Sequence, residues 1–246
     1  MQTLLWFRRN LRQDASVMHT RLLSCIPLIF SAIAVLGTTA HAQSLPAELP
    51  IMGPDGTRVA NHAIPKGSVT AAEKLPGAVV AANPDGDVTL VEFYDLNCPY
   101  CRRASADVDA LVKADKKLRL VLVPYPVLGL PSVLAGRVEI AVSKSVPPAD
   151  FYRYHRAIYE GRGVIDGQRA LEAASGFKLD QQKIVDAANS DDVTEIMKSH
   201  LRFANTLALQ ATPIFLIGDT AIQGHPGRAG LKAVIDAMRK CGKAVC

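Results

Sequence analysis

The stretch Val88-Thr-Leu-Val-Glu-Phe-Tyr-Asp-Leu-Asn-Cys98-Pro-Tyr-Cys101 runs from an apolar segment directly into a Cys-x-x-Cys motif. Residues 88–93 are mainly β-branched, aromatic and aliphatic, which is typical of a strand buried on both faces of a sheet. Pro99 suits the first position of a helix, because its φ is already close to the helical value and its missing N–H is not needed there. Apolar residues then recur at helical spacing as far as Val112. The stretch therefore predicts the order strand, Cys-x-x-Cys, helix.

The two cysteines at the start of this helix indicate thiol chemistry. Unpaired N–H groups and the positive end of the helix dipole stabilise a thiolate on Cys98, so we expect a lowered pKa and an exposed, attacking sulfur. Cys101 lies one turn further in, where its thiol can attack a mixed disulfide formed on Cys98 and release the product. A zinc half-site is the alternative. It needs a second ligand pair, and the available pair, Cys241 with Cys246, lies far downstream with unusual spacing.

Two motifs together resemble a known family. The run Val-Glu-Phe-Tyr-Asp-x-x-Cys-Pro-Tyr-Cys at 91–101, followed later by Ala211-Thr-Pro-Ile-Phe-Leu-Ile-Gly218, is similar to the DsbA-like thiol:disulfide oxidoreductases of the bacterial envelope. The likeness covers about Asp87 to Lys240. It implies an α/β thioredoxin-like fold with an inserted α-helical subdomain, and no metal or organic cofactor. It also implies cysteine-containing envelope proteins as substrates and a membrane redox partner that recycles the dithiol.

The amino terminus has the features of a secretory signal peptide. An apolar run from Leu22 to Leu36 is short for a membrane span and is followed by the small-x-small pattern Ala40-His41-Ala42. We interpret residues 1–42 as the leader and predict export to the periplasm, with an uncleaved anchor as the alternative. Met18 suits the start of an ordinary leader better than Met1, so it is the alternative translation start. Cleavage leaves roughly 200 residues, enough for one sizeable core.

Most of the net charge of +5 belongs to this leader. The leader contains Arg8, Arg9, Arg12 and Arg21 against Asp14, so the mature chain is nearly neutral. No basic cluster with interleaved aromatic residues indicates nucleic acid, and no second apolar run indicates a membrane span. The composition therefore favours protein partners.

The mature chain keeps four cysteines in a compartment where disulfides persist. Each pair of near neighbours can close locally, whereas cross-pairing would join distant elements. We therefore predict a redox pair, Cys98–Cys101, and a structural disulfide, Cys241–Cys246. Two inert terminal thiols are the alternative for the second pair.

Elements on either side of the motif complete the predicted fold. Five prolines interrupt residues 44–77, so we predict an extended amino-terminal arm over 43–78, with a turn at Gly53-Pro-Asp-Gly56. This arm is too short for the dimerisation domain that some disulfide isomerases carry. Residues 79–246 then form the DsbA-like domain. Within it, 118–123 is a second buried strand, and strand–helix–strand at this spacing gives a right-handed parallel unit.

The second half of the domain is predicted as helices, a hairpin and a closing helix. Helical patterns fill an insertion at about 131–209, with helices at 132–143, 149–159, 167–174, 180–188 and 191–209. Strands at 214–217 and 220–223 flank a two-residue turn and read as a hairpin. An amphipathic helix through Leu231 and Met238 closes the chain. The predicted order is βαβ, helices, ββα.

Pro213 is a further candidate catalytic residue, and three neighbouring residues are predicted to border the substrate. By the resemblance, Pro213 is the cis proline that thioredoxin-like folds hold against the Cys-x-x-Cys, with an ordinary trans turn proline as the alternative. A cis bond leaves main-chain groups near Thr212 free to pair with an extended substrate. We place Pro99 and Tyr100 beside them at the substrate-binding surface.

Glu92 is the remaining candidate for catalysis. A carboxylate inside an apolar strand must be paired, protonated or functional to offset its desolvation. We interpret it as a relay for the proton of Cys101, and the alternative is a strand-edge Glu that reaches solvent or a Lys. The nearby charges, including Asp95, are interpreted as solvated, although Arg102 and Arg103 could help to hold a thiolate. Two histidines, His155 and His225, are interpreted as structural or surface residues.

We therefore interpret the chain as an exported protein-disulfide oxidoreductase that exchanges disulfides through Cys98 and Cys101 and acts as a monomer. Thiolate stabilisation on Cys98 favours the oxidising direction. Two alternatives stay open. One is a disulfide isomerase or reductase of the same fold, and the other is a non-catalytic binder of a metal such as copper that uses the same two sulfurs. The metal content after purification under reducing conditions distinguishes the binder from an enzyme.

Overall fold

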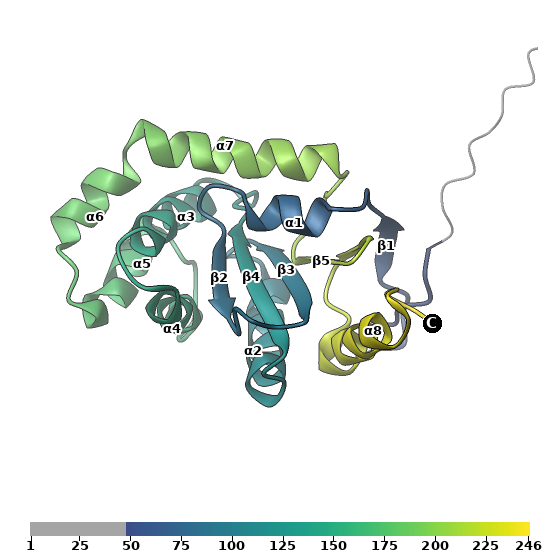
Figure 1. The fold of residues 1–246 in the computed structure, drawn as a ribbon. Coiled ribbons are helices and arrows are strands. Elements are labelled where there is room, and N and C mark those ends of the chain that lie inside the picture. The colour runs from purple at the N-terminus through teal and green to yellow at the C-terminus, as the bar shows by residue number, and fades with distance from the viewer. Residues whose placement is uncertain (1–47) are drawn as a thin grey trace, which may run out of the picture. The chain divides into compact units, whose positions relative to one another are not determined.

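Residues 48–246 are described by the computed structural model; the leader predicted for residues 1–42 and the alternative start at Met18 lie outside the described residues. A six-stranded sheet in the order β1-β6-β5-β3-β4-β2 forms the centre of the described domain (Figure 1). The strands are β1 (Ala60–Ala63), β2 (Val79–Ala82), β3 (Val88–Tyr94), β4 (Leu118–Pro124), β5 (Ile214–Ile217) and β6 (Thr220–Gln223). Strands β3 and β4 are parallel, and the other neighbouring pairs are antiparallel.

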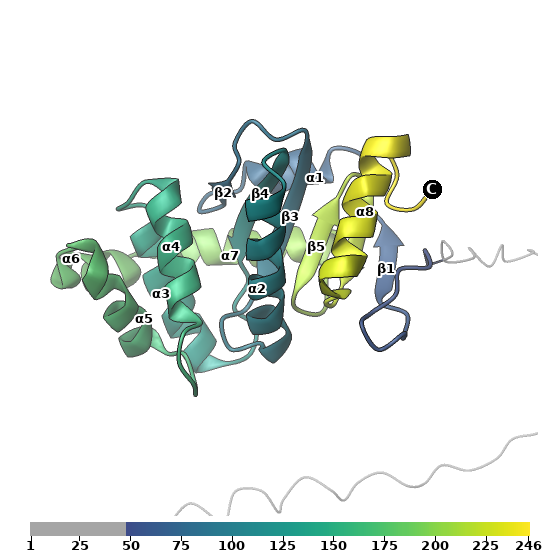
Figure 2. The same ribbon diagram turned by 90° about the horizontal axis from the view of Figure 1, so that it is seen from below.

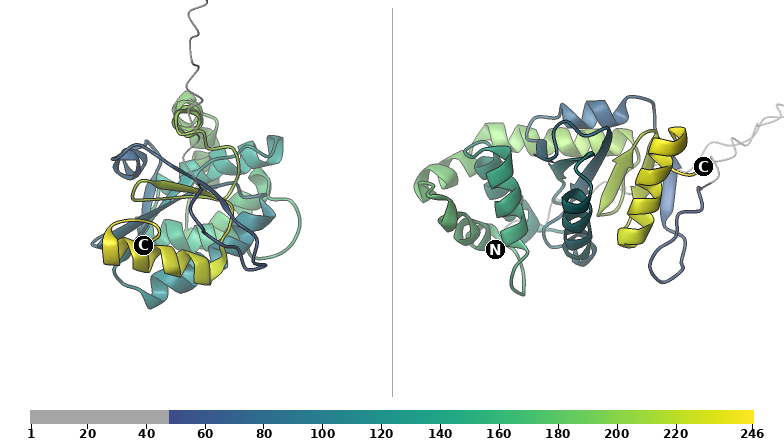
Figure 3. Two further views of the ribbon diagram at one scale, coloured as in Figure 1. Left: turned by 90° about the vertical axis from the view of Figure 1, so that its right-hand side faces the viewer. Right: turned by 60° about the horizontal axis from the view of Figure 1, so that its bottom comes forward.

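Helices cover both faces of this sheet. Helices α2 (Pro99–Ala114) and α8 (Gly227–Cys241) lie on one face, and α1 (Ser68–Glu73) and α7 (Asp191–Thr206) lie on the other (Figures 1 and 2). Beyond the β2 edge, four helices gather into a subdomain (Figure 3). They are α3 (Leu130–Ser143), α4 (Pro148–Ile158), α5 (Gly167–Ala174) and α6 (Gln181–Ala188), and a 3-10 turn at Ser175–Phe177 joins α5 to α6. None of the helices in residues 48–246 combines the length and apolar character needed to cross a bilayer.

The predicted order βαβ, helices, ββα is confirmed, and the five predicted helices lie within a few residues of their predicted bounds. Alternation along β3 sends successive side chains to opposite faces. Val91 and Phe93 pack with the core under α1 and α7, whereas Leu90 and Tyr94 pack with the core shared by α2, α8 and the helical subdomain. Glu92 lies between Leu90 and Tyr94 in the alternation, so its side chain also faces the α2 side of the sheet.

The segment predicted as an extended arm is more structured than predicted. The turn at Gly53–Gly56 is present, since the Gly56 N–H donates to the Gly53 carbonyl at 3.1 Å. However, β1 adds an edge strand by pairing with β6, and α1 follows it. Strand β1 has the sequence Ala-Asn-His-Ala, which lacks apolar alternation, so only its pairing identifies it as a strand. The prolines at 65 and 76 flank α1 instead of interrupting it.

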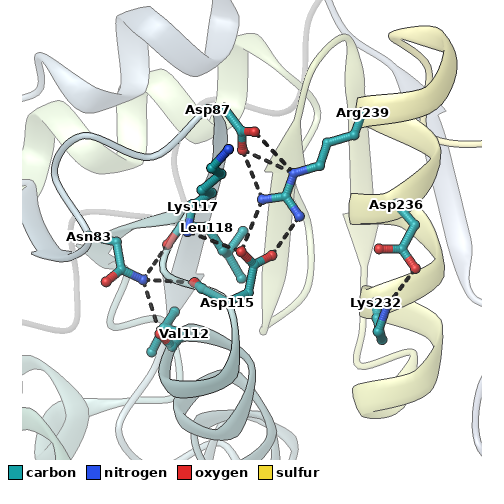
Figure 4. Close-up of polar contacts among 9 residues, drawn as sticks. All are labelled: Asn83, Asp87, Val112, Asp115, Lys117, Leu118, Lys232, Asp236 and Arg239. Atoms are coloured by element: carbon teal, nitrogen blue, oxygen red, sulfur yellow. Dashed lines mark hydrogen bonds and ion pairs between the residues drawn. The ribbon is translucent and has the colours of Figure 1, made fainter.

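A charged cluster fixes the end of α2 that lies opposite the Cys-x-x-Cys (Figure 4). Arg239 on α8 bridges two carboxylates, with Nη2 2.8 Å from Asp87 Oδ1 and Nη1 2.6 Å from Asp115 Oδ2. The side-chain amide of Asn83 donates to three carbonyl oxygens around the α2–β4 connection. These contacts anchor α2 and α8 to the sheet, so the opposite end of α2 has a fixed position over β3.

Candidate active site

The cysteine motif occupies the first turn of α2. Cys98 is the N-cap residue, and its sulfur accepts a hydrogen bond from the Cys101 N–H at 3.4 Å. The Cys98 thiol donates to the carbonyl oxygen of Thr212 at 3.2 Å. Both cysteines are free thiols in this structure. The pKa of Cys98 is lowered to about 6, chiefly because the Cys101 thiol donates to its sulfur. The Thr212 side chain and the backbone N–H groups of Cys101 and Tyr100 also lower it, and burial opposes them.

The prediction that Cys98 has an exposed sulfur is wrong, because the residue is only 4% exposed. Cys101 is fully buried, and burial is the main cause that raises its pKa well above the ordinary thiol value. Two neighbours of Cys98, Tyr100 and the hydrogen-bonded Thr212, line a groove of about 510 Å³. The two sulfurs are thus distinguished by proton affinity more than by exposure.

The loop before β5 lies against the cysteines. The Thr212–Pro213 peptide bond is cis, as the resemblance implied, and the Pro213 carbonyl accepts a hydrogen bond from the Gly224 N–H at 2.8 Å. Thr212 is partly buried beside Cys98, whereas Tyr100 is 55% exposed. The three residues predicted to border substrate, Thr212, Pro99 and Tyr100, therefore lie around one sulfur.

Glu92 is almost fully buried in β3, which is flanked by β4 and β5, so the alternative of a solvent-reaching Glu at a sheet edge is wrong. Burial, and after it the charge of Cys98, raises the pKa of Glu92 to about 8, while Arg156 opposes the shift. The charge of Glu92 in turn helps to raise the pKa of Cys101. A carboxyl group that titrates near neutral pH is therefore electrostatically coupled to both sulfurs.

Asp95 is not the solvated surface charge that we predicted. It is 1% exposed, and its carboxylate accepts hydrogen bonds from the backbone N–H groups of Val127 and Leu128 at 2.7 and 2.9 Å and from the Ser132 hydroxyl at 2.7 Å. It also accepts from the Asn97 N–H at 2.8 Å, the Asx turn that an Asp-x-Asn sequence favours. The Asx turn could be predicted from the local sequence. The three hydrogen bonds from residues 127–132 could not, because these residues are distant along the chain.

Asn97 makes a second link from the motif to the helical subdomain. Its side-chain amide accepts from the Ile165 N–H and donates to the Ile165 carbonyl, both at 2.8 Å. The loop that leads into Cys98 is therefore held by the subdomain from two sides. Sequence motifs predicted this role for neither Asp95 nor Asn97.

The two arginines after Cys101 contact other groups instead of the Cys98 sulfur. Arg102 donates to the carbonyl oxygens of Tyr159 and Gly161, and the Arg103 guanidinium lies 4.4 Å from the centre of the Tyr100 ring. The structural reading of the two histidines is consistent with their contacts. His155 is buried against Glu139, and His225 Nε2 lies 2.9 Å from Asp107 Oδ2.

The lowered pKa of Cys98 gives a direct spectroscopic prediction. Titration of the reduced protein should show thiolate absorbance appearing with a midpoint near pH 6, and Cys98→Ser should remove that transition. A depressed folded-state pKa stabilises the folded reduced protein above the ordinary thiol value of 9.0, and this stabilisation is lost as the pH falls through about 6. A midpoint near the ordinary thiol value would contradict this assignment.

Cys241, the last residue of α8, forms a disulfide with Cys246, and their Cα atoms are 6.3 Å apart. In Figures 1 and 2 this carboxyl end lies near β1, away from the first turn of α2. We predict that replacing both residues with Ser leaves the rate of insulin reduction near that of the unchanged protein. A loss of more than about tenfold, equivalent to ~1.4 kcal/mol of barrier lowering, would show that the terminal pair takes part in exchange.

A family model and the similar solved structures agree on one family for this chain. A family model described as thioredoxin matches residues 74–237. A thioredoxin-like oxidoreductase from Silicibacter pomeroyi is 33% identical with a TM-score of 0.64, over 72% of this chain and 99% of that one. A periplasmic thioredoxin-like protein from Salmonella enterica serovar Typhimurium is 25% identical with a TM-score of 0.59, over 70% of this chain and 96% of that one.

Two curated proteins are also similar in sequence. Disulfide bond formation protein D of Bacillus subtilis is 24% identical over 185 residues, which are 70% of this chain and 82% of that protein. The Na(+)/H(+) antiporter NhaA of Herminiimonas arsenicoxydans is 24% identical over 157 residues, which are 63% of this chain. The chain spans only 25% of the length of that antiporter.

Proposed function

This chain belongs to the thioredoxin family, as a DsbA-like thiol:disulfide oxidoreductase, and on that premise we propose that it oxidises cysteine pairs in other exported proteins through Cys98 and Cys101. The observation that carries the proposal is the position of Cys98 at the N-cap of α2, where it accepts from Cys101 and lies 3.2 Å from the Thr212 carbonyl. We propose periplasmic export through the leader, and recycling by a membrane redox partner.

The reaction proceeds by two exchanges. In the first, a substrate thiolate attacks Cys98 of the Cys98–Cys101 disulfide, forms a mixed disulfide and expels the Cys101 thiolate. In the second, another substrate thiolate attacks the substrate sulfur of the mixed disulfide and expels the Cys98 thiolate. Two electrons pass from the substrate dithiol to the enzyme. Backbone groups at Thr212, beside Pro99 and Tyr100, are suited to hold an extended substrate segment during both steps.

Glu92 is proposed as the proton donor and acceptor for Cys101. The buried Cys101 thiolate binds a proton strongly, and Glu92, with a pKa of about 8, still carries a proton at neutral pH. Glu92 therefore protonates the expelled Cys101 thiolate in the oxidising direction. In the reverse direction its carboxylate accepts the proton when Cys101 attacks.

The lowered pKa of Cys98 supports the oxidising direction. Near pH 7, a pKa of about 6 favours the thiolate by about 1.4 kcal/mol. This stabilises the reduced enzyme and makes its disulfide about 30 mV more oxidising, because the couple transfers two electrons.

A glutathione redox titration of the Cys98–Cys101 pair tests the direction, together with sedimentation of the mature protein. We expect a reduction potential above the ~−270 mV of thioredoxin, in the direction of the ~−120 mV of strong dithiol oxidants, and a monomer. A potential near that of thioredoxin would favour a reductase. A stable dimer that isomerises scrambled ribonuclease would instead establish an isomerase.

A further inference from the structure

The groove beside the redox cysteines has walls from two distant parts of the chain. One wall includes Tyr100 and Thr212, and the Thr212 carbonyl oxygen lies 3.2 Å from the Cys98 sulfur. The other wall comes from the segment 53–60, which leads into the first residue of β1. The groove has a volume of about 510 Å³, which is within the usual range for ligand sites in proteins. It is therefore large enough to hold part of a bound segment.

The amino-terminal wall of this groove is a folded hairpin. We call residues 51–59 the arm hairpin. The Val59 N–H donates to the Ile51 carbonyl at 2.9 Å, which closes the hairpin. Just beyond it, the Asn61 side chain accepts from the Leu49 N–H at 2.7 Å and donates to the Leu49 carbonyl at 2.9 Å. These bonds hold the two ends of the arm hairpin together, so the wall has a defined shape.

The first turns of α8 have glycines where the arm hairpin packs. A Cβ atom at Gly227 would lie 2.7 Å from Pro54 Cγ, and one at Gly230 would lie 3.1 Å from the Met52 carbonyl oxygen. A side chain at either position would therefore push the hairpin away. In Figure 2 the arm hairpin is the loop that leads into β1, and it lies beside one end of α8. The position of the wall is thus fixed by close contact with α8.

The arm hairpin is an addition to the part of the chain that carries the cysteine chemistry. The thioredoxin family model matches residues 74–237, which include Cys98 and Thr212 but not the arm hairpin. The hairpin supplies no group to the two sulfurs, yet it lines the groove that includes Thr212. A wall that is close to the reacting sulfur without taking part in exchange is suited to selecting substrates.

Two arginines give this groove a positive character. Arg58 belongs to the arm hairpin and Arg103 to α2, and both line the groove. The Arg58 guanidinium donates to the Glu48 carbonyl at 3.2 Å, and that of Arg103 lies over the Tyr100 ring. Within residues 48–246, neither side chain has a carboxylate within salt-bridge distance. Both charges are therefore available to a bound segment.

The other ionisable groups of the groove do not cancel these two charges. Asp55 also lines it, and its Oδ1 accepts hydrogen bonds from the N–H and the hydroxyl of Thr57, at 3.0 and 2.7 Å. His225 lines it too, and its Nε2 lies 2.9 Å from Asp107 Oδ2, so a proton on this ring is compensated by that carboxylate. Two arginines against one aspartate leave the groove positive.

We propose that the substrate segment beside the reacting cysteine lies between the arm hairpin and Thr212, and that Arg58 and Arg103 favour segments with Asp or Glu next to that cysteine. The proposal rests on the function assigned to Cys98 and Cys101 above. A substrate carboxylate can form a charge-assisted hydrogen bond with either guanidinium, whereas a lysine is repelled. Because both arginines are exposed, the preference is a moderate one.

The test compares two peptides that each contain one cysteine and differ only in having Glu or Lys on both sides of it. In Cys101→Ser, Cys98 is first converted to its mixed disulfide with thionitrobenzoate. The peptide thiolate attacks the Cys98 sulfur and expels thionitrobenzoate, whose absorbance gives the rate. The intrinsic reactivity of each peptide is the same with every variant, and a change at Cys98 itself affects both peptides. The ratio of the two rates therefore reports the groove.

Reversing either charge should shift this ratio towards the lysine peptide. We expect the ratio of the glutamate rate to the lysine rate to fall about fivefold in Arg58→Glu and in Arg103→Glu, and further when the two are combined. The shift should shrink in 1 M salt, where the Debye length is only ~3 Å. If circular dichroism shows that a reversed variant does not fold, the corresponding Arg→Gln variant should give a smaller shift in the same direction.

Lys116→Glu is the matched control, because it makes the same change in charge at an exposed residue just beyond the other end of α2. The 16 residues of that helix span about 24 Å, well beyond the ~8 Å Debye length at physiological salt. Its ratio should equal that of the unchanged groove.

A second experiment locates the bound segment directly. A peptide with a photoreactive benzophenone next to its cysteine is joined to Cys98 of Cys101→Ser, illuminated, and mapped by digestion and mass spectrometry. Peptides that carry the probe before or after the cysteine are both used. We expect one of the two to crosslink within residues 53–60.

An unchanged ratio in both Arg58→Glu and Arg103→Glu would overturn the proposal, and so would an equal change in Lys116→Glu. Crosslinks from both peptides that lie only in the helical subdomain would also overturn it. If Cys98 of Cys101→Ser forms no mixed disulfide with either peptide, the function assigned to Cys98 and Cys101 is what fails.

Discussion

Cys101→Ser should accumulate mixed disulfides with other proteins, whereas Cys98→Ser should form none and should lose turnover. The reason is the difference in proton affinity between the two sulfurs. The pKa of Cys98 is lowered to about 6, so its thiolate is abundant at neutral pH, while burial raises the pKa of Cys101 far above the ordinary thiol value. Cys101 is fully buried, whereas Cys98 contacts Thr212, which lines a groove together with Tyr100.

The measurement is trapping in cells that express each variant, with acid quenching, alkylation of free thiols and non-reducing electrophoresis. Complexes that disappear on reduction should be found only with Cys101→Ser. The double variant with Ser at both positions is the control for non-specific adducts. Trapping by both single variants to the same extent would overturn the assignment of Cys98 as the attacking sulfur.

Glu92→Gln should make the protein more stable and its Cys101 step slower. At pH 7 an unfolded Glu is ionised, but folded Glu92, with a pKa raised from 4.5 to about 8, must hold a proton. Below the unfolded-state pKa of 4.5 both states hold the proton, so the buried carboxyl group does not lower the free energy of unfolding. That free energy falls as the pH rises from there to the folded-state pKa of about 8. At about 1.4 kcal/mol per pH unit, Glu92 costs about 3 kcal/mol at pH 7, a penalty that the neutral Gln avoids.

The stability gain should depend on pH in a way that identifies its origin. Denaturant unfolding of Glu92→Gln and the unchanged protein should give equal stabilities below pH 4.5, a difference that grows up to about pH 8, and a constant difference above that. Glu172→Gln, on the exposed side of α5, is the control and should change neither quantity. A pH-independent gain would show that the pKa of Glu92 is not raised.

The kinetic effect of Glu92→Gln is the second part of this prediction. Loss of a positioned acid or base typically slows its step by a factor on the order of a hundred. Release of peptide from a mixed disulfide on Cys98 should slow accordingly, while thiolate titration of Cys98 should change little, because its main stabilising contact is the thiol of Cys101. Release at the unchanged rate would remove Glu92 from the mechanism.

Local sequence signals determined the order of elements and the chemistry of the motif. Pro99 marks the start of α2, Gly218-Asp219 marks the hairpin between β5 and β6, and apolar periodicity gave the five helices between the two halves of the sheet. These features were predictable because each depends on residues within one turn or a few positions along the chain. The pairing of Cys241 with Cys246 was predictable for the same reason, since the two residues are close in sequence.

Only the tertiary structure decided the features that depend on distant partners. The polar strand β1 exists because β6 pairs with it, and Asp95 is buried because the backbone at 127–128 and Ser132 return to bond its carboxylate. Burial of Cys98 and the meeting of Tyr94, Glu139 and His155 likewise require elements far apart along the chain. A sequence records which groups can form hydrogen bonds or ionise, but their solvation and proton affinity depend on what the fold packs around them.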